Sequence, residues 1–411
     1  LGFLSGCDYL DIVPDNLPTL EMAFNNKSSA ERFLFTCYSF VPEHGKIGTD
    51  PGMDVGDEVW YYSDNSADYS NKTTFWIAKG MQNSNEPLVD YWNGTQWGKA
   101  MFVGIRDCNV FIENIEKVPD LSAYDKETWK AEAKVLKAFY HFWMMRMYGP
   151  IPIIKENIPV SAAEDEVRVV RDKIDDIVTY IVSLIDESVE YLPLNIQNEA
   201  AEMERITRPA AKAIKAKILA FAASPFFNGN LDYANFKNAE GEPFFNQVYD
   251  NEKWTKAADA CLEAIQCAEE AGHGLYEFVN MSSTQLSDET ILSLSNRCKV
   301  TERWNKELVW GCGQSGIRDL QVLCQPWLES NYSSDDRYHN ARNGTFAPTL
   351  AVAETFYTKN GVPMDEDKNY DYSKRYTTQV ATEADKYYIQ PGYTTAKLHF
   401  DREPRFYATL G

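Results

Sequence analysis

The first residue with a chemically suggestive setting is Cys7, which follows Leu4-Ser5-Gly6 at the end of a short apolar stub. This stub cannot span a bilayer, because a transmembrane helix needs about 20 apolar residues. Small residues before a cysteine are typical of the end of a bacterial lipoprotein signal, where the thiol receives a lipid and becomes the mature N-terminus. We therefore predict that residues 1–7 are a signal-peptide remnant with its lipobox, and that a lipid on Cys7 tethers the protein to a membrane.

A second group of candidate residues consists of aromatic side chains in segments that lack helical periodicity. Sugar rings present flat C–H faces, so an aromatic ring with polar neighbours is suited to bind them. The stretch DEVWYYSDNS over 57–66 has this composition, and so does the irregular region over 304–327, which also holds Trp310. The alternative for each ring is that it packs beneath its own loop. The residues predicted to bind ligand are Trp60, Tyr61, Tyr62, Trp76, Trp304, Arg318 and Trp327.

No catalytic signature accompanies these residues. With 61 acidic residues, pairs of carboxylates are no indication of a glycosidase, and the sequence has no nucleophile elbow, HExxH or glycine-rich phosphate loop. The segment 365–371 imitates the start of a calcium loop, but Tyr370 and Tyr376 occupy the glycine and glutamate positions, which favours a solvated acidic turn. We expect a protein that is not an enzyme and that has no cofactor and no metal site.

The formal net charge of −21 limits the classes of ligand. Nucleic acids and sulfated glycans require surfaces rich in Lys and Arg, and the sequence contains no cluster of these residues. A neutral ligand is therefore expected, and no nucleic acid.

Seven cysteines remain after Cys7, so they cannot all pair with one another. Helical patterns contain Cys108, Cys261 and Cys267, which are predicted to be small buried side chains. Irregular sequence contains Cys298, Cys312 and Cys324, where one disulfide could form.

Helical periodicity predicts the scaffold that must position these residues. The clearest helix covers 126–148, with Asp125 as its expected N-cap and Gly149 as its stop. Thr207 is expected to cap a helix over 208–224. Further helices are predicted over 28–41, 86–117, 169–191 and 254–272, whereas 42–85 and 273–348 are predicted to be irregular.

Composition along these helices predicts how they pack. The many alanines over 208–224 project little from the helix surface, so a neighbouring helix can pack closely on it. The segment 254–272 alternates small and large residues as tetratricopeptide helices do, although the full repeat pattern is missing. The predicted fold class is mainly α: a tetratricopeptide-like helical-repeat scaffold with long irregular aromatic-rich loops. Apolar helix faces contain Trp97, Trp129, Trp143 and Trp254, which are predicted to lie in the core.

Several stretches together resemble the SusD-like (SusD/RagB) family of surface glycan-binding lipoproteins. They are LSGC, EAKVLKAFYHFWMMRMYGPIPII, RPAAKAIKAKILAFAASPFFNGN, APTLAVAETFYTKNGVP and DREPRFYATL, and the resemblance runs from Cys7 to Gly411. It implies a helical tetratricopeptide scaffold at the outer membrane of a Gram-negative bacterium, capping a SusC-like TonB-dependent transporter. On this basis residues 8–26 are a tether and 27–411 a single SusD-like domain, which looks truncated because family members usually continue beyond DREPRF.

The expected function is that of a lipid-anchored, surface-exposed outer-membrane protein. It would bind an oligosaccharide or polysaccharide and deliver it to the SusC-like transporter for nutrient uptake. The alternative is a helical-repeat scaffold that docks proteins or peptides at the outer membrane.

Overall fold

Helices form most of the regular structure in the computed structural model, which describes residues 20–43, 46, 50–61, 73–313, 320–321, 324 and 346–410. The chain forms two compact units, which we describe separately. The first unit comprises residues 1–41, 100–195 and 206–264, and the second comprises 42–99, 196–205 and 265–411. No helix in the described ranges combines the length and the apolar composition needed to traverse a bilayer.

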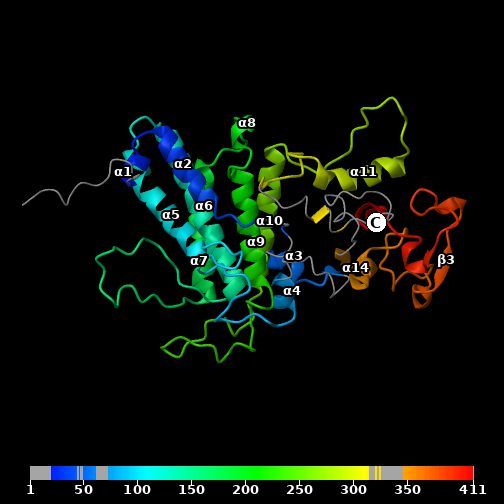
Figure 1. Ribbon diagram of the computed structural model, residues 1–411, viewed down its shortest axis with the longest axis horizontal. Helices are drawn as coiled ribbons and strands as arrows, with labels where there is room; N and C mark the ends of the chain where they lie inside the picture. The colour runs from blue at the N-terminus through cyan, green and yellow to red at the C-terminus, as the bar shows by residue number, and fades with distance from the viewer. Residues whose placement is uncertain are drawn as a thin grey trace, which may run out of the picture. The chain divides into compact units, whose positions relative to one another are not determined.

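The first unit is a stack of helices in which α2 contacts α5, α5 contacts α6, α6 contacts α7 and α7 contacts α9 (Figure 1). This arrangement confirms the mainly α fold class. The helices are α1 (Leu20–Ala23), α2 (Lys27–Tyr38), α5 (Met101–Asn114), α6 (Ala123–Tyr148), α7 (Ile174–Asp186), α9 (Arg208–Ala223) and the start of α10 (Glu252–Glu270), with 3-10 turns at Ile115–Lys117 and Val189–Tyr191.

Helix α6 lies in the core of this unit. Every side chain from Val135 to Met145 is buried, as expected of a helix with neighbours on all sides. The predicted cap, Asp125, is wrong: the helix begins one turn earlier, where the Ser122 hydroxyl accepts a hydrogen bond from the Asp125 N–H at 3.0 Å. Asp125 lies in the first turn instead, where its negative charge interacts favourably with the helix dipole. Gly149 ends the helix as predicted, with a φ of 68° that suits glycine.

Two buried polar residues of α6 hold the segment that follows the helix. The Lys137 ammonium donates to the Lys155 carbonyl at 2.6 Å, and burial lowers its pKa to about 8. The His141 Nε2 accepts from the Ile154 N–H at 3.2 Å, while Nδ1 lies 2.8 Å from the Lys137 carbonyl. Burial lowers the pKa of His141 to about 4, so the ring is neutral and its partners give it a structural role.

Helices α9 and α10 meet through alanines, as the sequence predicts. Ala216 packs with Ala260 and Ala264, and these small side chains allow the helices to approach closely. Thr207 caps α9, accepting a hydrogen bond from the Ala210 N–H at 3.4 Å, which confirms the expected cap.

Two side chains of α10 depart from their predicted burial. Trp254, predicted to be core, is 42% exposed, and Cys261, predicted to be buried, is exposed. The buried face of α10 consists mainly of small residues about one turn apart. Trp254 and Cys261 lie to one side of this face, so their side chains reach solvent. The buried residues of α10 are Ala257, Ala260, Ala264 and Cys267.

The helix predicted over 86–117 begins only at Met101, and Trp97 is not a core residue. The Asp90 carboxylate accepts hydrogen bonds from the N–H groups of Trp92 and Asn93 and from the Thr95 hydroxyl, which organises a turn instead of a helix. Trp97 follows this turn with a φ of 71° and is 61% exposed.

The second unit has short elements and long connections. Strand β1 (Val59–Tyr61) pairs antiparallel with β2 (Phe346–Pro348), and β3 (Thr378–Val380) pairs antiparallel with β4 (Thr394–Ala396). Helix α11 forms within the segment predicted to be irregular; it contains no buried residue, so no apolar stripe identifies it in the sequence. The helices are α3 (Pro51–Asp54), α4 (Thr73–Ala78), α8 (Glu199–Glu202), α11 (Asp288–Thr301), α14 (Leu350–Thr355) and α15 (Pro404–Thr409), with 3-10 turns at Tyr372–Lys374, Glu383–Asp385 and Lys397–His399.

A buried arginine organises the core of the second unit. The guanidinium of Arg402 donates to the carbonyls of Ala353, Phe356 and Leu398 at 2.7 Å each and to that of Tyr357 at 3.3 Å. It therefore joins α14 to the segment before α15. The surrounding core cluster consists of Ala353, Met364, Tyr370, Leu398 and Phe406.

The remaining predictions concern the tether and the burial of single residues. Residues 20–26, which the sequence assigns to the tether, include α1 and the buried Phe24, whose ring contacts Phe33 and Phe111 at 5.3 and 5.9 Å between centroids. Burial of Trp129, Trp143, Cys108 and Cys267 is confirmed, and Cys298, Cys312 and Cys324 are free thiols.

Candidate functional site

Trp60 lies on β1 with its ring supported from one side. Its ring meets the buried ring of Phe75 from α4 edge to face, with 5.3 Å between centroids and 78° between planes. Phe75 in turn packs on the buried Phe346 of β2 at 5.7 Å. Trp60 is 38% exposed, so its ring is held by this cluster while part of its surface remains open to a ligand.

Trp76 adjoins the same cluster, because it directly follows Phe75 in α4. It is 45% exposed, and the Lys79 ammonium lies 5.2 Å from its ring centroid, a cation–π distance. Trp60 therefore contacts Phe75 through its ring, whereas Trp76 is its neighbour along α4. We call Trp60, Phe75, Trp76 and Phe346 the aromatic platform.

The backbone beside Trp60 is fixed by the start of α14. Thr349 donates its hydroxyl to the Asp57 carbonyl at 2.6 Å and its N–H to the Glu58 carbonyl at 3.1 Å. The side chains of Asp57 and Glu58 are left exposed beside the platform. Carboxylates in this position can accept hydrogen bonds from the hydroxyls of a sugar whose ring face lies on Trp60.

Trp304 and Trp310 are held by their own part of the chain. Trp304 has a φ of 55°, and its ring lies against Gly311, where an added Cβ would come within 2.7 Å of it. The Trp310 Nε1–H donates to the Glu204 carbonyl at 3.0 Å. Through these contacts the two rings stabilise their own loop. Trp304 and Trp310 therefore have less exposed ring surface than Trp60 and Trp76.

Four of the singled-out residues lie outside the described part of the chain. They are Cys7, Tyr62, Arg318 and Trp327. Tyr61 lies on β1, and its side chain is also outside the described set.

A polar cluster in the second unit escaped the sequence analysis. The Glu354 carboxylate accepts hydrogen bonds from Arg375 Nε at 2.7 Å, from the Tyr372 hydroxyl at 2.8 Å and from the Tyr376 hydroxyl. The Arg375 guanidinium lies 3.9 Å from the ring centroid of Tyr372 and 4.3 Å from that of Tyr376. The two tyrosines that flank the arginine in YSKRYTT were the available signal, but their carboxylate partner is distant in sequence.

The calcium-like segment is a closed turn. The Asp367 carboxylate accepts hydrogen bonds from the Thr358 hydroxyl at 2.5 Å, the Asn360 amide at 2.9 Å and the Asn369 N–H at 2.8 Å. These donors lower its pKa, and Asp367 is buried, so the expectation of a solvated acidic turn is wrong for this residue, whereas Asp365 and Glu366 are exposed. Within the described ranges, no three His, Cys, Asp or Glu side chains are grouped so that they could hold a metal.

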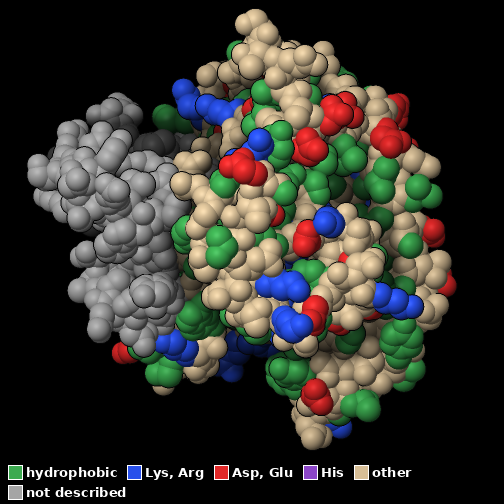
Figure 2. Space-filling model, turned by 90° about the vertical axis from the view of Figure 1, so that its right-hand side faces the viewer, with side chains coloured by type: hydrophobic (Ala, Val, Ile, Leu, Met, Phe, Trp, Pro, Cys, Tyr) green, Lys and Arg blue, Asp and Glu red, His purple; other side chains and the backbone are tan. Residues whose placement is uncertain are grey.

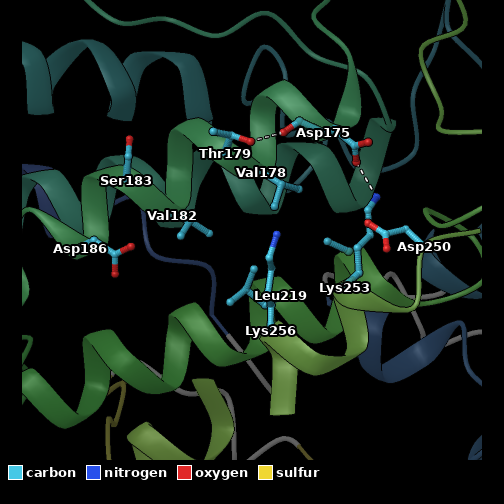
Figure 3. A pocket seen from close by; sticks show the side chains of 11 residues that line it. Asp175, Val178, Thr179, Val182, Ser183, Asp186, Leu219, Asp250, Lys253 and Lys256 are labelled. Carbon is cyan, nitrogen blue, oxygen red and sulfur yellow. Dashed lines mark hydrogen bonds and ion pairs between the residues drawn. The ribbon is translucent and has the colours of Figure 1, made fainter. Parts of the chain in front are cut away.

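A second candidate site is a groove of about 480 Å³ in the first unit, between α7, α9 and the start of α10 (Figure 3). Asp175 pairs with Lys253 at 2.5 Å at one end, and Asp186 pairs with Lys215 at 2.6 Å at the other. Figure 3 shows Lys256 extending between α7 and α9. The groove has an apolar floor but no aromatic ring in its lining, which is Asp175, Val178, Thr179, Val182, Ser183, Asp186, Leu219, Ala222, Asp250, Lys253 and Lys256.

Comparisons with known proteins agree with this architecture. Residues 8–219 match the family model described as "Starch-binding associating with outer membrane", and residues 317–411 match the model of the SusD family. No curated protein matches the chain.

Solved structures with the same fold cover nearly all of the chain. The protein BT4246 is 28% identical with a TM-score of 0.74, and the match covers 93% of this chain and 64% of that one. A SusD-like protein from Bacteroides fragilis (BF3747) is 16% identical with a TM-score of 0.62, covering 94% and 60%. A SusD-like carbohydrate-binding protein from the same species (BF0978) is 17% identical with a TM-score of 0.56, covering 94% and 59%. The chain therefore spans about three fifths of the length of these structures.

Proposed function

The chain belongs to the SusD-like family, and from this membership we propose that it captures an oligosaccharide or polysaccharide at the cell surface. The observation that carries the proposal is the aromatic platform, where Trp60 and Trp76 keep open ring surface and Phe75, which packs on Phe346, supports the ring of Trp60. A ring fixed in this way loses little conformational freedom on binding, so more of the contact energy contributes to affinity.

Charge supports a neutral ligand. The platform adjoins the exposed carboxylates of Asp57 and Glu58, and the chain has a net charge of −21, both of which would repel a polyanion. On the face shown in Figure 2, acidic, basic and apolar side chains are interspersed. A neutral glycan meets no such repulsion, and its hydroxyls can donate to the carboxylates.

The proposed mechanism is capture without chemistry. Several weak contacts along a polymer hold it at the surface, because each bound segment raises the effective concentration of the next. Delivery to a SusC-like TonB-dependent transporter, for nutrient uptake, completes the proposal. A dissociation constant near 1 mM, about 4 kcal/mol of binding free energy, is sufficient for such a role.

The first prediction concerns the platform. Replacing Trp60 or Trp76 with Ala should weaken glycan binding about two- to tenfold, because an aromatic contact contributes roughly 0.5–1.5 kcal/mol beyond area burial. The double variant should show no measurable binding. Calorimetric titration with a panel of neutral oligosaccharides measures the effect, and Trp254→Ala, an exposed tryptophan on α10, is the matched control. Wild-type affinity in both single variants, with folding intact, would exclude the platform as the site.

The groove in Figure 3 favours one second candidate function, a scaffold that docks a protein or peptide. Its apolar floor suits an aliphatic side chain, and Lys256 would pair with a carboxylate. Screening glycan and peptide arrays with wild type, Trp60→Ala and Lys256→Glu separates the two functions. Peptide binding that Lys256→Glu removes and Trp60→Ala preserves would establish the scaffold function in place of glycan capture.

The second prediction concerns the membrane. With its signal intact, the protein should partition into detergent, and Cys7→Ala should release it, because a multiply acylated cysteine holds firmly to a bilayer. Mild solubilisation and crosslinking of the anchored protein should recover an outer-membrane transporter in near-equal amount. An unmodified Cys7 in the mature protein would contradict the anchor, and a protein that purifies alone would contradict the partnership.

A further inference from the structure

Two fully buried cysteines face each other in the first unit. Cys37 lies on α2 and Cys108 on α5, both side chains are completely inaccessible, and the Cys37 thiol is close enough to raise the pKa of the Cys108 thiol. Each is a free thiol in the structure. The Tyr140 hydroxyl donates to the Cys37 carbonyl, so α6 closes the same site from a third side.

Gly104 provides independent evidence that α5 lies close to the end of α2. A Cβ at this position would lie 2.9 Å from Cγ of Phe40 and 3.0 Å from its Cβ, so only glycine fits against that ring. Gly104 precedes Cys108 by about one helical turn, and Phe40 follows Cys37 by about one turn. Phe40, just beyond the end of α2, thus lies against Gly104, and one turn back along each helix Cys37 comes opposite Cys108, as in an antiparallel pair.

We propose that Cys37 and Cys108 form a disulfide when the chain folds under oxidising conditions. The Cys37 thiolate attacks a disulfide donor, which forms a mixed disulfide and releases one donor thiol. The Cys108 thiolate then attacks the Cys37 sulfur, which forms the protein disulfide and releases the second donor thiol. The two protein thiols are oxidised, the donor disulfide is reduced to two thiols, and the protons of the cysteines end on the donor.

The bond must form before the helices close. In the folded protein neither sulfur is accessible to a donor, and burial together with the neighbouring Cys37 thiol raises the pKa of Cys108, which keeps it in the unreactive thiol form. The disulfide would close a loop containing residues 42–99, the segment that carries Trp60 and Trp76. Closing a long loop restricts the unfolded chain and so stabilises the fold.

The test is oxidative refolding of the whole chain. Protein that has been denatured and reduced is refolded with oxidised glutathione, and free thiols are then alkylated and the peptides mapped. We expect a peptide with Cys37 linked to one with Cys108, a mass lower by two hydrogen atoms, and an unfolding equilibrium constant roughly 30- to 1,000-fold smaller than after reduction. The same oxidant added to protein folded in the reduced state should leave both thiols reduced; if it oxidises them, closure does not have to follow bond formation and that part of the inference is wrong.

Two variants provide the matched comparison. Cys108→Ala should abolish the link and leave Cys37 alkylated, whereas Cys267→Ala, which removes another buried cysteine, should retain it. The wild-type map alone decides the inference if a variant fails to fold. Alkylation of both Cys37 and Cys108 after oxidative refolding, or their linkage to other cysteines, would overturn it.

Discussion

Replacing Arg402 with Met should raise the free energy of the folded second unit by about 3–5 kcal/mol, enough to unfold a domain of ordinary stability. Arg402 is 3% exposed, and its guanidinium satisfies four backbone carbonyls while lying 4.4 Å from the ring centroid of Phe406. Met has similar length and fills the space, so the variant removes the hydrogen bonds without leaving a large cavity.

The cost arises from the carbonyls that lose their donor. Each buried acceptor without a partner costs about 1–3 kcal/mol, and water cannot reach a site this enclosed without opening the core. Burial lowers the pKa of Arg402, but guanidinium stays charged in proteins, so the charge is compensated by the carbonyl dipoles in the native state. Arg402→Lys should recover only part of the loss, because one ammonium cannot reproduce the planar fork.

Arg405 offers the control, since it lies three residues further on in the same DREPRF stretch. Its side chain is 56% exposed and pairs with Glu403, an arrangement that contributes little to stability. Urea denaturation of Arg402→Met and Arg405→Met measures both. A change below 1 kcal/mol for Arg402→Met would show that the second unit does not depend on these hydrogen bonds.

In the sequence, DREPRF was only one of the stretches that resemble the family, and no role was predicted for Arg402. Arg402 is a surface residue by type, and its acceptors lie near residues 353–357, about 45 positions earlier, as well as at Leu398. Nothing in the local pattern identifies a contact across that separation. A hydrogen-bond network of this kind becomes visible only when the fold brings distant backbone groups together.

Local signals did predict the main helices of the first unit. The apolar periodicity over 126–148, the glycine stop and the Thr207 cap are each determined by neighbours within a turn, and each matches α6 or α9. The wrong predictions arise where the local pattern is absent or misleading. Helix α11 has no buried stripe, and Trp97 follows a turn held by the Asp90 carboxylate, which interrupts a pattern that otherwise reads as helical.

The residue types of the candidate site could be predicted from the sequence, but the packing that supports its rings could not. Aromatic and acidic residues outside helical patterns identified the stretch around Trp60 as a candidate. Trp60 lies on β1, which pairs with β2 so that Trp60 is opposite Ala347, and the supporting ring of Phe346 comes from the same distant strand. Local sequence patterns do not reveal pairing between strands almost 290 residues apart, so the sequence could not show how the ring is supported.

Trp143 should be the most costly tryptophan to remove from the first unit. It is 3% exposed on α6, its ring lies 6.3 Å from that of Phe139, and the Arg146 guanidinium lies 5.1 Å from its centroid. Trp143→Ala should reduce the free energy of unfolding by about 3–5 kcal/mol, because the lost burial is compounded by a cavity that α6, packed on all sides, cannot collapse to fill. Trp143→Phe should lose less, since it keeps most of the ring volume.

Trp254→Ala is the comparison that makes this prediction specific to burial. Both tryptophans were predicted to be core from helical spacing, yet Trp254 is 42% exposed, so its removal should cost less than about 1 kcal/mol. Thermal and urea unfolding, monitored by circular dichroism, measure the two variants under the same conditions. Equal losses for Trp143→Ala and Trp254→Ala would contradict the prediction and would mean that Trp254 is covered in the native protein.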